Sequence, residues 1–365
     1  MKLRVGIVGC GKFADVHVQQ VHALDSAEVV AVCDLEPLMA RQMAVRYSLP
    51  AMYSDLGRML AEQRLDVLHI TTPPASHPAL ASIAMEAGCH VFVEKPLALN
   101  LKAAQAIVAA AEHHTRKLCI NYWYNYDPPG EALRRLVEEG VLGEPVHVES
   151  VFGYDLSGVF GSALLGDNEH WVHHLPGKLF HNVLDHVVNK IALFMPDADP
   201  RISAFDHRHR PASGDAVTDA VMDELRFLMQ GERVSGYGLI SSHAQPAGQT
   251  LRVYGTRNTI QVDFQKRTVV VETAQTVPAA LGRLLAAFSH ARGYRRCAYG
   301  NLRQFLWAEF HAFEGMRRLL RAFYDCIRRD TAPPIPYAEM LRVSGLMDAL
   351  IGRLAQTRLA LEGRR

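Results

Sequence analysis

The chain opens with a short apolar strand that runs directly into a glycine turn and then a helix. Residues 3–14 read Leu-Arg-Val-Gly-Ile-Val-Gly-Cys-Gly-Lys-Phe-Ala. Gly9 permits the tight turn, Gly11 lets the backbone approach a ligand, and Ala14 stands where a third small residue allows close packing of helix on strand. The helix directs its unpaired N–H groups and the positive end of its dipole at whatever lies above the turn. This arrangement is typical of a site for the pyrophosphate of a dinucleotide.

A second apolar run, residues 29–33, ends in Asp34, about 20 residues after Ala14. An acidic side chain at this spacing accepts hydrogen bonds from the ribose hydroxyls of NAD and repels the 2′-phosphate of NADP. We therefore expect NAD as the cofactor, with NADP less favoured. An ordinary strand–turn–helix unit, in which Asp34 caps the next helix, is the alternative that this pattern leaves open.

Strand and helix patterns alternate over the first 120 residues. Apolar runs predict strands at 5–8, 29–33, 67–70, 91–93 and 117–122, and helical patterns lie between them, starting near 14 and at 37–47, 78–87 and 101–113. Strands separated by helices pair in parallel through right-handed crossovers. We expect an α/β protein in which residues 1–123 form a Rossmann domain, that is, a doubly wound parallel sheet.

The pattern changes after residue 130, and a chain of 365 residues is long enough for two domains. Longer strands follow one another through turns and are predicted at 146–154, 216–228, 233–241, 250–254, 259–264 and 267–272. Such a pattern favours an antiparallel sheet with helices on one face. We expect residues 124–365 to form an α+β domain with a large, mostly antiparallel sheet, which serves substrate binding.

The bulk composition excludes several classes of protein. With 39 basic and 38 acidic residues, the chain lacks the charge excess typical of nucleic acid binding. No apolar run approaches the ~20 residues that span a bilayer, so no integral membrane segment is expected. The six cysteines form no Cys-x-x-Cys pair and no signal-peptide pattern is present, which favours free thiols in the cytoplasm.

Polar residues follow three predicted strands, where parallel sheets place their ligands. Together with the glycine turn they form our candidate cofactor-binding set: Gly9, Gly11, Lys12, Phe13, Asp34, Thr71, Thr72, Pro73, His77, Glu94, Lys95 and Asn121. Lys95 is the main catalytic candidate, because the proline after it favours an extended conformation at the strand end. An amine that is desolvated beside a positive nicotinamide exchanges protons more readily near neutral pH. A solvated lysine at a helix start is the alternative.

Residues 178–191 sort their side chains by helical period. Lys178, Asn182, Asp185, His186 and Asn189 share one stripe at spacings of three and four, and apolar residues occupy the other face. A polar stripe that holds a histidine suits a catalytic face in a cleft. A solvent-exposed amphipathic helix shows the same pattern.

Taken together, these motifs resemble the glucose–fructose oxidoreductase and inositol dehydrogenase family, Gfo/Idh/MocA. The resemblance rests on the turn at 9–14, Asp34, Thr72-Pro73-Pro74 with His77, Glu94-Lys95-Pro96 and the later helix with His186, and it covers essentially the whole chain. It implies an NAD-dependent oxidoreductase that moves hydride between nicotinamide and a secondary hydroxyl or ketone of a sugar, polyol or sugar derivative. The resemblance also implies that Lys95 and His186 are the proton-transfer groups and that residues 124–365 serve oligomerisation, with a homodimer or homotetramer expected.

The chain departs from the family pattern at Asn182, where an aspartate is usual. An amide can position a hydroxyl but supplies no negative charge to His186, and Asp185 beside it is a candidate to compensate. Tyr124 stands where an arginine often follows the Asn121 strand. We therefore do not transfer a substrate from the inositol or glucose enzymes, and we expect the candidate substrate residues to be Tyr124, His170, Trp171 and His173, with no metal.

Two other functions stay open on the same fold. NAD could be a recycled cofactor for epimerisation, elimination or glycoside cleavage, or the chain could be a non-catalytic NAD-binding sensor. Residues 278–305 alternate leucines with five arginines. This segment is interpreted as packing over the active site or against another subunit, with peripheral membrane contact as the alternative.

Overall fold

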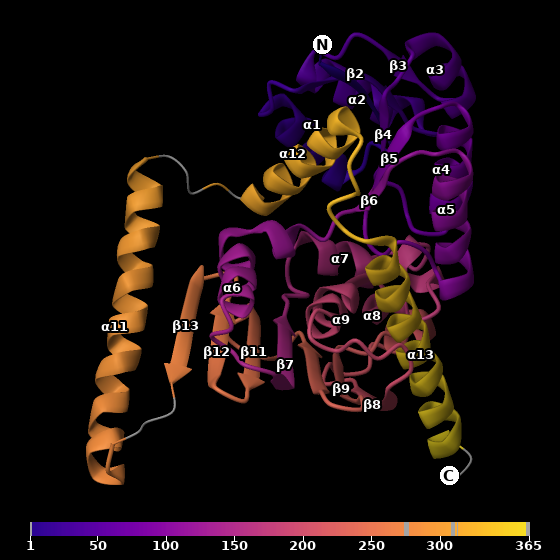
Figure 1. Cartoon of the computed structure of the whole chain (residues 1–365). Helices are drawn as coiled ribbons and strands as arrows, with labels where there is room; N and C mark the ends of the chain where they lie inside the picture. Colours follow the sequence, from indigo (N-terminus) through magenta and orange to yellow (C-terminus); the bar gives the residue numbers. More distant parts are fainter. Residues whose placement is uncertain (1, 274–276, 308–310, 312, 363–365) are drawn as a thin grey trace. The chain divides into compact units, whose positions relative to one another are not determined.

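The computed structural model describes residues 2–273, 277–307, 311 and 313–362 (Figure 1). The chain forms two compact units. The first comprises Met1–Trp123 and Phe313–Gly345, and the second comprises Tyr124–Ala312 and Leu346–Arg365. Helix α13 (Tyr337–Glu362) and the 3-10 helix η1 (Trp123–Tyr126) each contribute residues to both units.

The first unit is built on a six-stranded parallel sheet of order β3-β2-β1-β4-β5-β6. Its strands are β1 (Leu3–Val8), β2 (Ala27–Cys33), β3 (Met52–Tyr53), β4 (Val67–Ile70), β5 (His90–Val93) and β6 (Leu118–Ile120). The connecting helices are α1 (Lys12–His22), α2 (Pro37–Tyr47), α3 (Leu56–Gln63), α4 (His77–Glu86) and α5 (Leu101–His113). The strand order reverses between β1 and β4, so the predicted doubly wound sheet is confirmed, and ligands of such sheets bind at this reversal.

The sequence analysis missed the short elements β3 and α3. A strand of two residues is too short to show a period. The only sequence signal for helix α3 is its N-cap residue, Asp55. In the structure, Asp55 Oδ1 accepts a hydrogen bond from Arg58 N at 2.7 Å. Asn100 caps α5 in the same way, accepting from Ala103 N at 2.9 Å, and that helix has the predicted bounds.

Residues 313–345 belong to the first unit, although the sequence analysis placed them in the second domain. Helix α12 (Glu314–Arg329) fully buries Leu319, Leu320 and Phe323. The ring of Phe323 lies 5.8 Å from that of Phe92 on β5. The chain thus returns to its first domain after completing the second sheet, which no local pattern in the sequence reveals.

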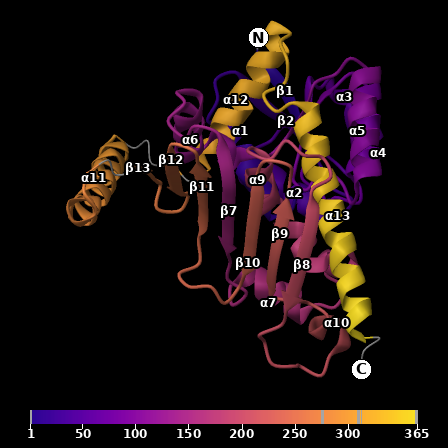
Figure 2. The same ribbon diagram turned by 60° about the horizontal axis from the view of Figure 1, so that its bottom comes forward.

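The second unit is built on a seven-stranded sheet of order β13-β12-β11-β7-β10-β9-β8. Its strands are β7 (Pro145–Gly153), β8 (Arg201–His207), β9 (Glu224–Gln230), β10 (Ser235–Ser241), β11 (Gln249–Gly255), β12 (Asn258–Asp263) and β13 (Thr268–Thr273). Only β7 and β10 pair in parallel, so the predicted mostly antiparallel sheet is confirmed. Figure 2 shows β11, β7, β10, β9 and β8 side by side.

One predicted strand of this sheet was wrong, and one strand was missed. The segment 216–228 is not one strand, because Asp215 caps a short helix, α10 (Ala216–Asp219), by accepting from Val217 N and Thr218 N. Strand β8 was not predicted at all. Its alternation of buried and exposed residues is confined to seven positions. The remaining helices are α6 (Pro128–Glu138), α7 (Val159–Gly166), η2 (Trp171–His174), α8 (Lys178–Val183) and α9 (Asp185–Ala192).

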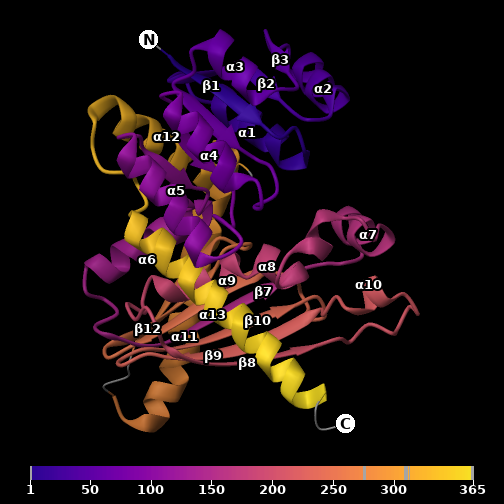
Figure 3. The ribbon, with the colours of Figure 1, turned by 90° about the vertical axis from the view of Figure 1, so that its right-hand side faces the viewer.

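Helices lie on both faces of this sheet. A side chain added at Gly236 of β10 would meet Ile191 of α9, so α8 and α9 cover one face. The long helix α11 (Ala279–Leu306) places Gly293 against Val270 of β13, whose side chain points to the opposite face. Figure 3 shows α8 and α9 on one side of the strands and α11 on the other.

The segment 278–305 thus falls almost entirely within a helix that contacts its own unit along one stripe. Gly282, Ala286, Gly293 and Cys297 are buried or partly buried there, and Cys297 Sγ donates to Val269 O at 3.4 Å. Large apolar side chains on the rest of the helix are exposed, among them Leu284 at 59%, Phe288 at 67% and Leu302 at 52%. Within the described part of the chain, none of the helices combines the length and the apolar character that crossing a membrane requires.

Helix α12 is also tied to the first sheet by a buried hydrogen bond, from which we predict a loss of stability. Tyr324 is fully buried and its hydroxyl lies 2.9 Å from His69 Nε2 on β4. Substitution Tyr324→Phe leaves a buried ring nitrogen without this partner, which we expect to reduce the free energy of unfolding by about 1–3 kcal/mol. Urea denaturation measures the change, with the exposed Tyr299→Phe on α11 as the matched control. Equal stability of the two variants would contradict the role of this bond.

Candidate functional site

The glycine turn has the backbone that the motif predicts. Gly9 adopts φ 90°, and a Cβ there would lie 2.9 Å from Thr72 N and 3.0 Å from Thr71 C. No other residue type is accommodated without moving the backbone of the neighbouring strand end. Gly11 caps α1 without a side-chain hydrogen bond, and a Cβ at Gly11 would meet nothing within 4 Å. The N–H groups in the first turn of α1 therefore face open space, as the binding of an anion at a helix N-terminus requires.

Asp34 lies at the end of β2 beside this turn. Its Oδ2 accepts a hydrogen bond from Cys10 N at 2.6 Å, and its Oδ1 accepts from Glu36 N at 2.9 Å. These two bonds hold the carboxylate in place while the side chain stays partly exposed. Leu35, the next residue, is 92% exposed.

The residues after β4 shape the loop beside the turn. Thr71 Oγ1 donates to Gly9 O at 2.6 Å, and Thr72 Oγ lies 2.6 Å from Ser76 Oγ. His77 is fully buried, with its ring nitrogens 2.8 Å from Thr72 O and 3.1 Å from Leu97 O. Burial lowers the pKa of His77. Thr71 and His77 thus hold the loop, whereas Pro73 is exposed.

Two predicted residues of the first helical turn lie at its surface. Lys12 is exposed and Phe13 is partly exposed. The ring of Phe13 packs edge-on against that of Phe313, with the centroids 5.9 Å apart.

The Glu94 carboxylate is buried and accepts hydrogen bonds at both of its oxygens. It is 7% exposed, and its Oε1 accepts from His17 Nε2 at 2.9 Å and from Asn121 Nδ2 at 2.5 Å. Its Oε2 accepts from Lys95 N at 3.2 Å. Burial raises the pKa of Glu94, but the bonds from His17 and Asn121 and the charge of Lys95 outweigh it, so the pKa is lowered and the carboxylate is ionised.

A buried chain of rings continues from Glu94. His17 Nδ1 lies 2.9 Å from His69 Nδ1, and His69 Nε2 lies 2.9 Å from the Tyr324 hydroxyl. Burial first, and then the neighbouring His17, hold the pKa of His69 well below its usual value, so this ring is neutral. The sequence analysis missed these three residues. The signal was present, since His17 and His69 are isolated polar residues on apolar faces of α1 and β4.

Lys95 follows β5 directly after Glu94, at the carboxyl end of the sheet, and is partly exposed. Its peptide bond to Pro96 is cis. Asn121, after β6, is 2% exposed, and none of the described residues donates a hydrogen bond to its buried Oδ1. The first unit therefore gathers Gly9, Asp34, Glu94, Lys95 and Asn121 at the strand ends, as the sequence analysis predicted.

The predicted catalytic stripe of the second unit is only partly exposed. Asn182 on α8 and His186 on α9 lie four residues apart and are partly exposed. Asp185 and Asn189 were expected on the same face, but they are 1% and 2% exposed. The acid beside His186 thus lies in the core of the unit.

Aromatic rings surround His186. The Tyr124 ring lies 5.5 Å from it in an edge-to-face arrangement at 87°, and the Phe152 ring lies 4.9 Å away. Tyr124 itself is partly exposed, and burial raises the pKa of its hydroxyl to about 12. Tyr124 therefore keeps its proton beside His186 at neutral pH.

Lys190, one turn beyond His186, is a functional candidate that the sequence analysis missed. It is 2% exposed, and desolvation lowers its pKa to about 7 despite the opposing charge of Asp185. Its Nζ lies 4.7 Å from the centre of the Tyr124 ring and donates to Gln249 Oε1 at 3.3 Å. The sequence analysis assigned no role to Lys190, and only its burial distinguishes it from other lysines.

The other candidate substrate residues lie around η2. Trp171 and His170 are partly exposed with stacked rings 5.7 Å apart. Burial, and then His173, lower the pKa of His170. His173 is 9% exposed and its Nε2 lies 2.7 Å from Leu164 O, so it anchors η2 to α7.

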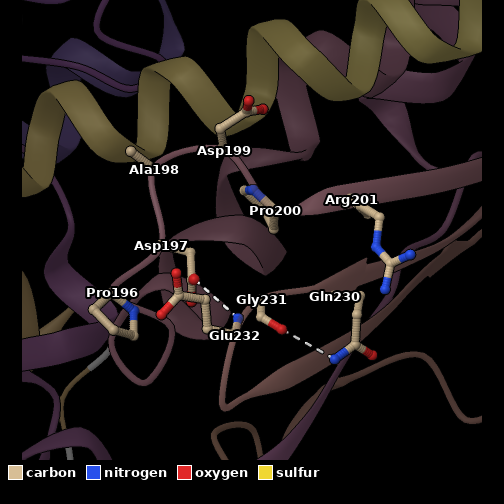
Figure 4. A pocket seen from close by; sticks show the side chains of 9 residues that line it. All are labelled: Pro196, Asp197, Ala198, Asp199, Pro200, Arg201, Gln230, Gly231 and Glu232. Carbon is tan, nitrogen blue, oxygen red and sulfur yellow. Dashed lines mark hydrogen bonds between the residues drawn. The ribbon is translucent and has the colours of Figure 1, made fainter.

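The predicted site residues were also compared with candidate metal ligands and with a surface hollow of the second unit. Among the described residues, no three His, Cys, Asp or Glu side chains are arranged to hold a metal ion. Figure 4 shows a hollow lined by Pro196–Arg201 and Gln230–Glu232. Asp197 Oδ1 accepts from Glu232 N there at 3.0 Å, and none of the predicted site residues lines it.

Comparisons with known proteins match part of the chain at the level of sequence. Residues 3–122 match the model of the oxidoreductase family with an NAD-binding Rossmann fold, GFO_IDH_MocA. A D-apiose dehydrogenase of Paraburkholderia graminis is 29% identical over 171 residues, which are 47% of this chain and 46% of that protein. An inositol 2-dehydrogenase of Burkholderia cenocepacia is 32% identical over 149 residues, which are 40% of this chain and 44% of that protein.

The chain thus spans about half the length of the curated relatives that it matches. The fold extends further than this sequence similarity. A crystal structure of an oxidoreductase from Agrobacterium radiobacter with NAD+, L-tartaric acid and magnesium covers 97% of both chains, with a TM-score of 0.76 and 17% identity. Residues 3–122 thus match the NAD-binding Rossmann domain of the Gfo/Idh/MocA oxidoreductases, and the two-sheet fold of the chain is that of the Agrobacterium radiobacter structure.

Proposed function

We propose that this protein is an NAD-dependent oxidoreductase that interconverts a secondary hydroxyl and a ketone on a sugar, polyol or sugar derivative. The observation that carries the proposal is Lys95 at the carboxyl end of the parallel sheet, directly after an ionised Glu94 whose oxygens are held by His17, Asn121 and the backbone. The names of the relatives, D-apiose dehydrogenase and inositol 2-dehydrogenase, support this substrate class.

The residues of the first unit fit NAD. The open first turn of α1 above Gly11 would hold the pyrophosphate, and Asp34 would accept from the ribose hydroxyls. The exposed Leu35 offers an apolar surface for the adenine ring, a contact that the sequence analysis did not consider. Asn121 donates a hydrogen bond from its amide nitrogen to Glu94, and its buried Oδ1 would accept a hydrogen bond from the cofactor. Bound NAD supplies the nicotinamide ring that takes or returns hydride.

Lys95 and His186 are the proposed proton-transfer groups, as the family resemblance implies. Lys95 would take the proton of the substrate hydroxyl during oxidation and return it during reduction. Asn182, one turn before His186, would position the substrate by hydrogen bonds and would not add negative charge. The aromatic and imidazole groups of Tyr124, His170 and Trp171 are the proposed contacts for the remaining hydroxyls, while the buried His173 supports them.

The substitution Lys95→Met tests this function. We expect it to lower the NAD-linked oxidation rate about 10²–10⁴-fold, because the main general acid/base is lost. NAD affinity should stay within about twofold, because the pyrophosphate and ribose contacts lie elsewhere. The rate is measured by NADH absorbance on a panel of sugars, polyols and glycosides, and NAD affinity by isothermal titration calorimetry.

The matched control for this test is Lys102→Met, which changes an exposed lysine on α5. Turnover of a panel compound without NADH release would favour epimerisation, elimination or glycoside cleavage with recycled NAD. NAD binding without turnover of any compound would favour a sensor. An unchanged rate in Lys95→Met would contradict the assigned role of Lys95.

Asp34 is predicted to set the preference for NAD over NADP. The substitution Asp34→Asn removes the charge that repels a 2′-phosphate and weakens the ribose contacts. We expect NAD to bind about tenfold more weakly and the preference over NADP to shrink, since about 1.4 kcal/mol corresponds to tenfold. Calorimetric titration of both cofactors measures this, with the exposed Asp25→Asn as the control. A wild-type protein that binds NADP as tightly as NAD would refute the prediction.

A homodimer or homotetramer is the proposed assembly, with α11 as part of its interface. The exposed apolar residues of α11 are more numerous than an isolated chain in water usually tolerates. The substitution Phe288→Glu places a charge in this surface and should shift the protein towards monomer in size-exclusion chromatography with light scattering. Ser289→Glu on the same turn is the control. A wild-type monomer that floats with anionic vesicles would instead favour peripheral membrane contact.

A further inference from the structure

Three buried titratable side chains of the first unit have no part in the proposed reaction. His17 on α1, His69 on β4 and Tyr324 on α12 are each 0% exposed. Together with Glu94 they form a buried row, in which each of the three neighbouring pairs of side chains is joined by a hydrogen bond of 2.9 Å. Because the row lies in the core and ends on a carboxylate, the positions of its protons can be worked out from its ends.

The carboxylate end fixes the first proton. An ionised Glu94 can only accept, so His17 Nε2 carries a hydrogen. A neutral His17 ring then has a bare Nδ1, to which His69 Nδ1 must donate. Burial first, and then His17, hold the pKa of His69 well below its usual value, so the neutral His69 ring has a bare Nε2. The Tyr324 hydroxyl therefore donates to His69 Nε2, and every donor in the row is directed towards Glu94.

The opposite proton order leaves one donor unsatisfied. A second proton on His17 would make its Nδ1 the donor to His69, and His69 Nε2 would then donate to the Tyr324 oxygen. The hydroxyl proton of Tyr324 would need a different acceptor, and within the described part of the chain the partner of this hydroxyl is His69. A buried hydroxyl without an acceptor is costly, so the order with a neutral His17 is favoured.

The row does not deliver a proton to Glu94. Such a delivery would move all three protons one step along the row and leave Tyr324 as a buried phenolate. Burial raises the pKa of Tyr324 well above its usual value, so its hydroxyl keeps its proton. The row is therefore a fixed line of donors that ends on an ionised carboxylate.

We propose that His69 and Tyr324 are positioning residues for Lys95, which act through His17 and Glu94. This inference rests on the proposed function. His69 fixes the tautomer of His17, so that His17 Nε2–H always faces Glu94 Oε1. The carboxylate then stays ionised, and its Oε2 accepts from Lys95 N at 3.2 Å. In this way the row holds the backbone from which the proposed general acid/base extends.

Other groups also act on Glu94. Burial opposes its ionisation, but the bonds from His17 and Asn121 and the charge of Lys95 lower its pKa on balance. His77 on α4 interacts with Glu94 electrostatically, and burial lowers the pKa of His77. Without the bond from His17, fewer groups oppose the effect of burial. We therefore expect Glu94 to take up a proton more readily, as the pH falls, in a variant that frees the tautomer of His17.

The first test needs neither turnover nor cofactor. In protein labelled with ¹⁵N in its histidine rings, the N–H···N bond between His17 and His69 should give a coupling between the two nitrogens in NMR spectra. We expect the donor ring of this pair to be neutral with a bare Nε2, and the acceptor ring to carry its hydrogen on Nε2. The pattern should persist between about pH 5.5 and pH 8.5, because the row is a fixed line of donors.

The substitution Tyr324→Phe identifies which ring is the donor. In the proposed order it should shift the bare Nε2 of the donor ring, because that ring is His69. The control Tyr299→Phe changes an exposed tyrosine on α11 and should leave both rings unchanged. A doubly protonated donor ring, or a shift confined to the acceptor ring, would contradict the proton order.

The second test uses the proposed reaction. His69→Leu removes the donor to His17, whereas His69→Asn places an amide N–H near the position of Nδ1. We expect kcat of His69→Leu to fall about tenfold at pH 6, because about 1.4 kcal/mol corresponds to tenfold, and clearly less at pH 8.5, where Glu94 is ionised again. His69→Asn should recover most of the rate. NAD affinity should stay within about twofold, since the pyrophosphate and ribose contacts lie elsewhere.

The rates are measured by NADH absorbance and NAD affinity by calorimetric titration. The matched control is His113→Leu, which changes an exposed histidine on α5. A purely structural role of His69 would give a loss of kcat that does not depend on pH. The wild-type spectra test the proton order even where His69→Leu does not fold.

The outcomes separate this inference from the proposed function. The expected proton order, in a protein that oxidises no panel compound, supports the buried row and refutes the oxidoreductase assignment. Sugar oxidation by a protein whose donor ring is doubly protonated overturns the inference and leaves the assignment intact. A loss in His69→Leu that is independent of pH, or that His69→Asn does not reduce, also overturns it.

Discussion

The burial of the Glu94 carboxylate is the constraint on which the first unit depends. An ionised acid at 7% exposure is tolerated only where donors surround it, and His17, Asn121 and Lys95 N supply them. These donors come from α1, from the end of β6 and from the backbone after β5. One charge thus fixes three neighbouring elements at the carboxyl end of the sheet, where Lys95 follows.

The hydrogen-bonded chain that starts at Glu94 also includes a residue outside 1–123. The chain from Glu94 through His17 and His69 ends on Tyr324, which is supplied by a helix almost two hundred residues after the last strand of that sheet. The need to satisfy buried polar groups therefore ties residues 313–345 to the first unit in addition to their apolar contacts. In the second unit, the buried Lys190 ammonium imposes a comparable constraint. It donates to Gln249 Oε1 and so fixes the orientation of the Gln249 amide, whose nitrogen donates to the Tyr124 hydroxyl.

The sequence predicted the first sheet well because its information is local. The turn at Gly9, the acid at the end of β2 and the polar residues after β4, β5 and β6 are all set by short segments with one period. Residues such as Asp185 and Lys190 could not be placed in this way. The helical period predicts the side of the helix to which a side chain points. The groups that this side chain contacts come from β7, from β11 and from Phe264, which follows β12.

By itself the sequence determined the glycine turn, the strand–helix alternation and the residues at the strand ends, since these follow from backbone sterics and from periods of a few residues. Only the tertiary structure decided that α12 returns to the first sheet, that Asp185 is buried, and that Lys190, Gln249 and Tyr124 form one hydrogen-bonded chain. The physical reason is that burial and hydrogen-bond order depend on groups far apart in the chain, which meet only when the sheets are complete.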